Sequence, residues 1–245
     1  MGYSQQSDRT CKLAVMSKTS STIGPIKVLF DLPQVTIRTR SVSEMDNNVY
    51  LITAKTTGAQ VLIDAADEPD AIMELVESAA ADTPCDLDLV SVITTHEHWD
   101  HIRALPEIVE RTKVPTSAGA PDAEAIREAT GITAKVELKH GDKAQFPGIE
   151  LDVIGLRGHT PGSVALVYVP NGDEPTIIFS GDSLFPGGVG NTWDDPQRFD
   201  SLLTDVTERV FAVYDDDTVV LPGHGGSTVL GNERPHLDEW RQRGW

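Results

Sequence analysis

The chain has 245 residues with 20 Lys and Arg against 38 Asp and Glu, so its formal net charge is -18 and its sequence pI is about 4.6. This length is enough to bury the core of one large domain. The acidic balance argues against binding to nucleic acid or an anionic membrane, because lysine and arginine must supply that attraction. No apolar run reaches the roughly 18 residues that a membrane helix needs. With two cysteines and no disulfide framework, a reducing cytoplasm is the expected location.

The first part of the chain predicts strands followed by helices. Residues 1–25 are rich in Ser, Thr and Gln and are expected to form a mobile extension before a single domain at 26–245. Alternating or continuous apolar runs then predict strands at 34–40, 48–54 and 60–63. A helix is expected from Pro69 to about Ala79, a buried strand at 87–93, and a short helix over 102–109.

The second part repeats this order. A brief strand at 113–116 and a helix at 121–130 precede strands at 134–138, 149–155, 164–169 and 176–180. A long amphipathic helix opens at Asp195-Pro196 and its apolar stripe extends to Val210, before a last strand at 218–221. Two sheets packed face to face and covered by helices satisfy this order, so the expected fold class is α+β.

A histidine-rich segment, Thr95-His96-Glu97-His98-Trp99-Asp100-His101, follows the buried strand at 87–93. If strand geometry continues one step further, His96 and His98 point to the same side, because side chains alternate along a strand. Asp100 and His101 follow where the chain turns. Three imidazoles and a carboxylate suit zinc or another first-row divalent metal. The alternative is a polar loop with solvated histidines, but three of the seven histidines fall in this segment, which favours the metal site.

Three later residues share a context: His159, Asp182 and His224 each follow a glycine at the end of an apolar run. Glycine allows the backbone to turn sharply and to approach a ligand closely. Together with the histidine-rich segment they make seven ligands, which is enough for two metals. Asp64 ends the strand at 60–63, where it either braces the metal loops or simply forms a turn.

The order His96-x-His98-x-Asp100-His101, then His159, Asp182 and His224, resembles the metallo-β-lactamase-fold hydrolases. Gly158-His159-Thr160-Pro161-Gly162-Ser163 and Ser180-Gly181-Asp182-Ser183-Leu184-Phe185 are most similar to the glyoxalase II-like branch. The resemblance implies a four-layer αβ/βα sandwich of two mainly antiparallel sheets flanked by helices, with the site at one edge. It also implies the roles of the seven residues: His96, His98 and His159 on a first metal, Asp100, His101 and His224 on a second, and Asp182 as a bridge.

The same resemblance implies a hydroxide shared by two divalent cations, most simply zinc with iron or manganese as alternatives, that cleaves a small-molecule thioester or related ester. Asp100 and Asp182 are candidates for moving the proton. Phe185, Asn191 and Trp193 follow the bridging residue and are candidates for the substrate pocket. The segment 187–193 contains no Lys or Arg, although relatives place one there to meet the carboxylate of the thiol carrier. Glutathione is therefore not a secure expectation.

Three other functions fit parts of this pattern. A persulfide dioxygenase with a single iron held by two histidines and one aspartate is similar in sequence. A lactone hydrolase would use the same hydroxide. A metal-binding module without activity needs only one closed site, whereas seven ligands exceed what one closed zinc site needs. The oligomeric state is open.

Overall fold

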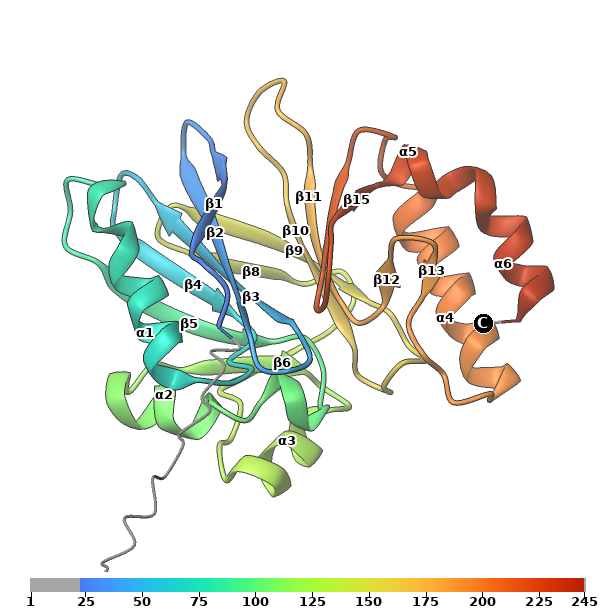
Figure 1. The fold of residues 1–245 in the computed structure, drawn as a ribbon, viewed down its shortest axis with the longest axis horizontal. Coiled ribbons are helices and arrows are strands. Elements are labelled where there is room, and N and C mark those ends of the chain that lie inside the picture. The colour runs from blue at the N-terminus through green and yellow to red at the C-terminus, as the bar shows by residue number, and fades with distance from the viewer. Residues whose placement is uncertain (1–22, 245) are drawn as a thin grey trace, which may run out of the picture.

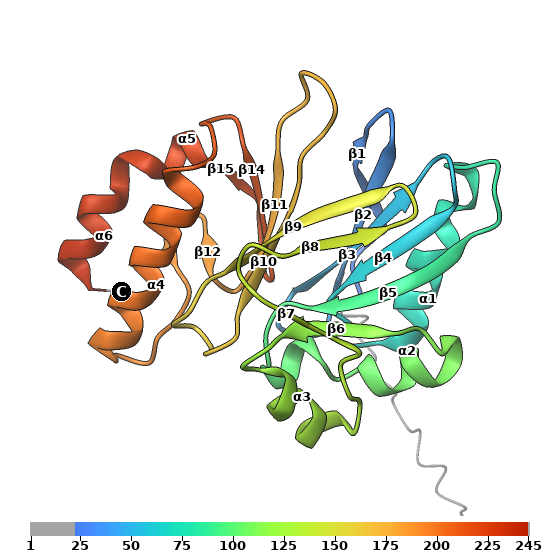
Figure 2. The same ribbon diagram turned by 180° about the vertical axis from the view of Figure 1, so that it is seen from behind.

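The computed structural model describes residues 23–244, in which two β-sheets pack face to face between two layers of helices (Figures 1 and 2). The first sheet is antiparallel from β1 to β4 and parallel from β4 to β7. Its strands, in spatial order β1 to β7, are Lys27–Asp31, Val35–Val42, Asn47–Ala54, Ala59–Ile63, Asp88–Thr94, Thr116–Gly119 and Val136–Leu138.

The second sheet has the order β15-β14-β11-β10-β9-β8 and is antiparallel except for the parallel pair β11 and β14. In chain order its strands are β8 Lys143–Phe146, β9 Ile149–Gly155, β10 Val164–Tyr168, β11 Ile177–Gly181, β14 Val219–Pro222 and β15 Thr228–Val229. A small ribbon of β12 (Leu184–Phe185) and β13 (Gly188–Val189) stands beside it. Both sheets are therefore mixed, and the expected sandwich of two sheets is confirmed.

Helices cover the outer face of each sheet, as both views of the ribbon show (Figures 1 and 2). The first sheet is covered by α1 Pro69–Glu77, α2 Leu105–Thr112 and α3 Ala123–Thr130, and the second by α4 Pro196–Val206, α5 Leu230–Glu233 and α6 Leu237–Arg243. Short helical turns are η1 Ser78–Ala81, η2 Trp99–His101, η3 Thr207–Phe211 and η4 Arg234–His236. Within residues 23–244, none of the helices is long and apolar enough to cross a membrane.

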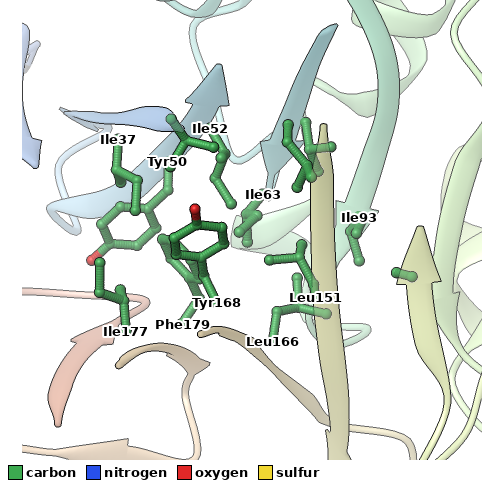
Figure 3. Packing of buried hydrophobic residues seen from close by; sticks show 14 of the residues in the cluster. Ile37, Tyr50, Ile52, Ile63, Ile93, Leu151, Leu166, Tyr168, Ile177 and Phe179 are labelled. Carbon is green, nitrogen blue, oxygen red and sulfur yellow. The ribbon is translucent and has the colours of Figure 1, made fainter. Parts of the chain in front are cut away.

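The core consists of three apolar layers, one between the sheets and one beneath each set of helices. Figure 3 shows the central layer, where Ile52 and Ile63 of the first sheet meet Leu166 and Phe179 of the second. Tyr50 packs edge-on against Phe179 with ring centroids 5.2 Å apart. Each such side chain contributes about 1.5–3 kcal/mol when fully buried. This layer fixes the two sheets, and hence the loops at their edges, relative to each other.

Three expected elements are corrected by the structure. The short helix expected over 102–109 is α2, Leu105–Thr112, because residues 102–104 form a turn after η2. The strand expected at 113–116 is β6, Thr116–Gly119, because Lys113 ends α2 in the left-handed conformation and Pro115 has no N–H to donate to a ladder. The helix expected to run unbroken to Val210 is α-helical only to Val206, and then widens into the π-turn η3.

The mobile extension expected at 1–25 lies outside the described residues except for its last three. Of these, Gly24 donates from its backbone N–H to the carbonyl of Ser41 at 2.8 Å. The described chain is therefore attached to β2 before residue 26.

Candidate metal centre

The ends of two parallel strand pairs lie at one edge of the sandwich. Parallel pairing of β4 with β5 places Asp64 beside the segment that begins at Thr95, and parallel pairing of β11 with β14 places Asp182 near His224. The loop between β9 and β10 carries His159 and meets the same edge, because β10 is antiparallel to both β9 and β11. A rigid sheet edge of this kind is where loops can hold chemical groups accurately.

Backbone hydrogen bonds join the two sheets at this edge. The N–H of Asn48 donates to the carbonyl of Gly223 at 2.7 Å, and the N–H of Val164 donates to the carbonyl of Thr95 at 2.9 Å. Gly223 leaves no room for a side chain, since a Cβ atom there would lie 2.2 Å from Oδ1 of Asp182. The loops that carry the candidate ligands are thus tied directly to one another.

Six of the seven candidate ligands form two groups. The first group is His96, His98 and His159, and the second group is Asp100, His101 and His224; within each group the ligand atoms all lie within 4.8 Å of one another. Asp182 lies between them. Its Oδ2 is 3.7 Å from Nε2 of His159 and 3.4 Å from Nε2 of His224, while its Oδ1 is 3.4 Å from Nε2 of His101. The structure therefore brings together all seven side chains that the sequence singled out.

Three of the histidines are oriented by acceptors behind them. Nδ1 of His159 donates to the carbonyl of Asn191 at 2.9 Å, and Nδ1 of His224 donates to the carbonyl of Met45 at 2.8 Å. Nδ1 of His101 lies 2.9 Å from Oδ2 of Asp64. Because these oxygens only accept, each Nδ1 carries the proton, and the lone pair of each neutral imidazole is on Nε2, toward the ligand groups.

Three buried polar atoms in this cluster have no hydrogen-bond partner among the described residues: Nε2 of His96, Nε2 of His159 and Oδ1 of Asp182. Buried polar atoms are nearly always satisfied, so three orphans side by side need an explanation. They are all lone-pair donors, and a divalent cation would satisfy them at once. The donor set therefore fits metal ions.

The two groups differ in protonation. Burial lowers the pKa of all three imidazoles of the first group, to about 4 for His159. Burial also opposes charge on His101 and His224, but neighbouring carboxylates outweigh it and raise the pKa of each to about 10. Asp64 and Asp182 act on His101, and Asp100 and Asp182 act on His224. The imidazoles of the first group are therefore neutral at pH 7, whereas those of the second group retain protons.

The two carboxylates in the cluster remain ionised. Burial by itself would raise the pKa of Asp100 and of Asp182, but the nearby imidazoles of His224 and His101 hold the pKa of each well below its usual range. Both side chains can therefore act as anionic ligands at neutral pH.

Asp64 has both roles that its position in the sequence allowed. It turns the chain at the end of β4 with φ of 58°. Its carboxylate accepts from the N–H and the hydroxyl of Thr95 at 2.7 and 2.8 Å, and contacts His101 as described above. Since the hydroxyl of Thr95 donates to Asp64, the same oxygen can accept from Nδ1 of His96 at 3.0 Å. One carboxylate thus orients His101 directly and His96 through Thr95.

Asn47 was not identified from the sequence. It is fully buried, and its Nδ2 donates to Oδ2 of Asp100 at 2.9 Å, while its Oδ1 accepts from the hydroxyl of Ser43 at 2.5 Å. The pair Asn47-Asn48 is typical of a turn. Because that local explanation is sufficient, no signal in the sequence indicates that one of the two amides points into a metal centre.

Trp193 lies over the first group. Its ring stacks on His159 with centroids 5.3 Å apart and meets His98 edge-on at 5.2 Å, yet half of its surface (50%) is exposed. Oδ1 of Asn191 accepts from the N–H of Trp193 at 2.7 Å, so this side chain shapes the loop. Phe185 is part of β12 and pairs with Gly188, and among the described residues no hydrogen bond or ring contact joins its side chain to the ligand groups.

Two arginines from other elements approach the loop that has no positive charge of its own. The guanidinium of Arg198, on α4, lies 4.5 Å from the centroid of the Trp193 ring, and Nη2 of Arg243, on α6, donates to the carbonyl of Gly187 at 3.0 Å. A cavity of about 530 Å³ is lined by Arg198 and by residues of the two metal loops, including Glu97, Gly158, Thr160 and Pro161. Two arginines therefore lie beside a loop that contains no Lys or Arg of its own.

The chain is similar to known proteins in both sequence and structure. The model of the "Metallo-beta-lactamase superfamily" matches residues 42–224. A protein of Thermosynechococcus vestitus named hydroxyacylglutathione hydrolase is 32% identical over 162 residues, which are 64% of this chain and 57% of that one. The crystal structure of ETHE1 from Myxococcus xanthus has a TM-score of 0.68 at 28% identity and covers 84% of each chain. That of TTHA1623 in a di-iron-bound form has a TM-score of 0.60 at 31% identity, covering 79% of this chain and 95% of the other.

Proposed function

Since the chain belongs to the metallo-beta-lactamase superfamily, we propose that it is a metal-dependent hydrolase that binds two divalent cations and cleaves a thioester or related ester of a small molecule. The observation that carries this proposal is the presence of two complete ligand groups with Asp182 in contact with both. A closed structural zinc site would need only four ligands.

We assign the first group to one cation, the second group to the other, and Asp182 to both. Two divalent cations in such a site supply hydroxide at neutral pH and polarise the carbonyl of a bound substrate. Zinc is the simplest choice for this histidine and carboxylate set, with iron or manganese as alternatives. The similar structure of TTHA1623 is of a di-iron-bound form, which supports a pair of cations and leaves the metal open.

The protein groups around the centre have three tasks in this reaction. The backbone carbonyls of Asn191 and Met45 and the carboxylate of Asp64 accept from Nδ1 of their histidines and so keep the ligand nitrogens aimed at the centre. Asp100 and Asp182 remain ionised, and are the carboxylates that can take up the proton released during attack. Ligation is expected to be their first role.

The substrate is proposed to lie against Trp193, whose exposed ring face adjoins the first group. A thioester suits this site because its leaving thiol has a pKa near 8.5 and departs as thiolate without strong acid assistance. The relative from Thermosynechococcus vestitus is named for a glutathione thioester, which supports the substrate class. Asn191 and Phe185 are proposed for the wall of the pocket. The cytoplasmic location stays a prediction.

A mononuclear iron dioxygenase, the alternative drawn from the sequence, is the second candidate, and the structural similarity to ETHE1 is consistent with it. One experiment separates the two. Protein purified without added metal is analysed for its metal content and then tested on acyl-thioesters, other esters and lactones, with oxygen uptake measured on a persulfide. We expect two equivalents of metal and thioester hydrolysis that a chelator abolishes. One equivalent of iron with oxygen uptake and no hydrolysis would overturn the proposal.

A further inference from the structure

Asp122 is a buried carboxylate that the metal centre described above does not use. It precedes α3 at the N-cap position, where an aspartate ordinarily accepts from the first N–H groups of its helix. Here it makes no side-chain cap, and it is fully buried. No lysine, arginine or histidine within residues 23–244 forms an ion pair with it. A carboxylate in such a position needs other donors to offset the loss of solvation.

Its donors come from both loops of the first group. Oδ2 of Asp122 accepts from the N–H of Glu97 at 3.1 Å and from the hydroxyl of Thr160 at 2.5 Å, and Oδ1 accepts from the N–H of Gly162 at 2.5 Å. Glu97 separates His96 from His98, and Thr160 directly follows His159. One side chain therefore connects the segments that supply all three imidazoles of the first group.

The backbone is shaped to permit this connection. A Cβ atom at Gly162 would lie 2.4 Å from the backbone nitrogen and 2.6 Å from Oδ1 of Asp122. A Cβ atom at Gly119, at the end of β6, would lie 1.9 Å from the carbonyl oxygen of Gly162. Glycine at both positions lets the loop after His159 close against the turn before α3. The loop after His159 is therefore in close contact with the turn before α3.

Burial raises the pKa of Asp122, so an ionised side chain here costs free energy. A residue needed only to begin α3 could be Ser, Asn or Thr without that cost. An ionised carboxylate has two acceptor oxygens, and here they accept from three donors on two loops. A residue that only caps α3 would not need both oxygens.

We propose that Asp122 is a positioning residue that fixes the loop of His96 and His98 relative to the loop of His159, and thereby sets the affinity of the first group for its cation. This inference rests on the proposed two-cation site. It concerns metal affinity alone, so it does not depend on which substrate is cleaved.

The test compares Asp122→Asn with wild type in zinc titrations of metal-free full-length protein against a chromophoric chelator. Asparagine offers one acceptor oxygen and an NH₂ group, so at least one of the three donors loses its partner. We expect one of the two zinc constants to weaken about 10- to 100-fold, as for other groups that orient metal ligands, and the other to stay unchanged. Thr160→Val removes a single donor and should weaken the same constant by a smaller factor.

Two controls make the result specific. Asp82→Asn changes a carboxylate that accepts three hydrogen bonds from Thr36 and Arg38 of β2, and should leave both constants unchanged. The double variant Asp64→Asn with Asp122→Asn should weaken both constants, because Asp64 braces His101 in the second group.

Any of three results would overturn the inference. Asp122→Asn could leave both zinc constants unchanged, it could weaken both constants equally, or Asp82→Asn could weaken them in the same way. If Asp122→Asn does not fold, Thr160→Val decides by the same criteria. Wild-type protein that binds two zinc ions without hydrolysing any thioester would refute the proposed substrate and leave this inference standing.

Discussion

The two ligand groups have similar geometry but opposite protonation. The first group consists of three buried imidazoles whose pKa values lie below the usual range, so they present lone pairs at neutral pH. The second group combines Asp100 with two imidazoles whose pKa is raised to about 10 by carboxylates. A cation at the first group therefore meets ready ligands, whereas a cation at the second group must displace protons. Histidines in the two groups therefore differ in pKa because their neighbours differ.

The groups also differ in what supports them. Behind the first group are the carbonyl of Asn191 and the carboxylate of Asp122, which both act on loops. Behind the second group are Asp64 and Asn47, which stand at the ends of strands of the first sheet. Asp64 also reaches His96 of the first group, but only through Thr95. Substitutions can therefore weaken one group more than the other, and the following predictions use that difference.

The largest effect is expected where the two groups meet. Asp182→Asn removes the carboxylate that contacts histidines of both groups, so both cations should be lost or strongly weakened. A metal centre supplies several kcal/mol of transition-state stabilisation, and each 1.36 kcal/mol is tenfold in rate, so kcat/KM should fall by about 10³-fold or more. Metal analysis and thioester kinetics test this. A variant with full metal content and near-normal turnover would contradict the bridging role.

Acidification should separate the groups by protonation. Neighbouring carboxylates raise the pKa of His101 and of His224 to about 10, and their Nε2 atoms lie 3.2 Å apart, so a cation at the second group must release at least one proton at neutral pH. Its affinity should therefore rise at least about tenfold per pH unit between pH 6 and 8. The first group, with His159 at a pKa of about 4, should change little over this range.

Calorimetric titration of zinc in buffers of different ionisation enthalpy measures the protons released at each step. We expect a near-zero value for one cation and one to two protons for the other. Equal release at both steps would mean that the groups do not differ in protonation.

Asp64→Asn should act mainly on the second group, because Asp64 contacts His101 directly and His96 only through Thr95. Asparagine tolerates the left-handed backbone at this position, so the turn is kept while one of the acceptors for Thr95 and His101 is lost. The second-group constant should weaken about 10- to 100-fold in a zinc titration. Asp82→Asn serves as the matched control, and an effect confined to the first group would be inconsistent with the hydrogen bonds of Asp64.

The smallest effect is expected at the surface of the first group. Trp193→Ala removes the exposed ring that stacks on His159, so KM should rise about fivefold, which corresponds to about 1 kcal/mol of lost aromatic contact, with kcat and metal content nearly unchanged. Trp193→Phe should restore most of the affinity. A fall in kcat with unchanged KM in steady-state assays would show that the ring supports the ligands instead of the substrate.

The ligands could be predicted from the sequence because they lie at the ends of strands in recognisable short segments. Asp122 and Asn47 escaped notice for the opposite reason: an aspartate before a helix and an asparagine in a turn already have local explanations. Their true partners are 25 to 53 residues away in the chain. Pairing over such separations depends on how the two sheets pack, which local propensity does not encode.

The same reasoning applies to the missed strands. The edge strands β1 and β8 are short and largely exposed, and their only consecutive apolar residues, Val28-Leu29-Phe30 of β1, form too short a run to predict a strand. They form because neighbouring strands offer unpaired backbone groups at the sheet edge. In contrast, β3, β4, β10 and β11 are buried along nearly all their length and were expected from their apolar residues.

The central claim is that two cations act together between the two ligand groups. It is tested most directly by adding zinc in small steps to chelator-treated wild-type protein while thioester hydrolysis is followed. We predict that hydrolysis reaches its maximum only at two equivalents per chain. Full hydrolysis at one equivalent, or none at two, would contradict it.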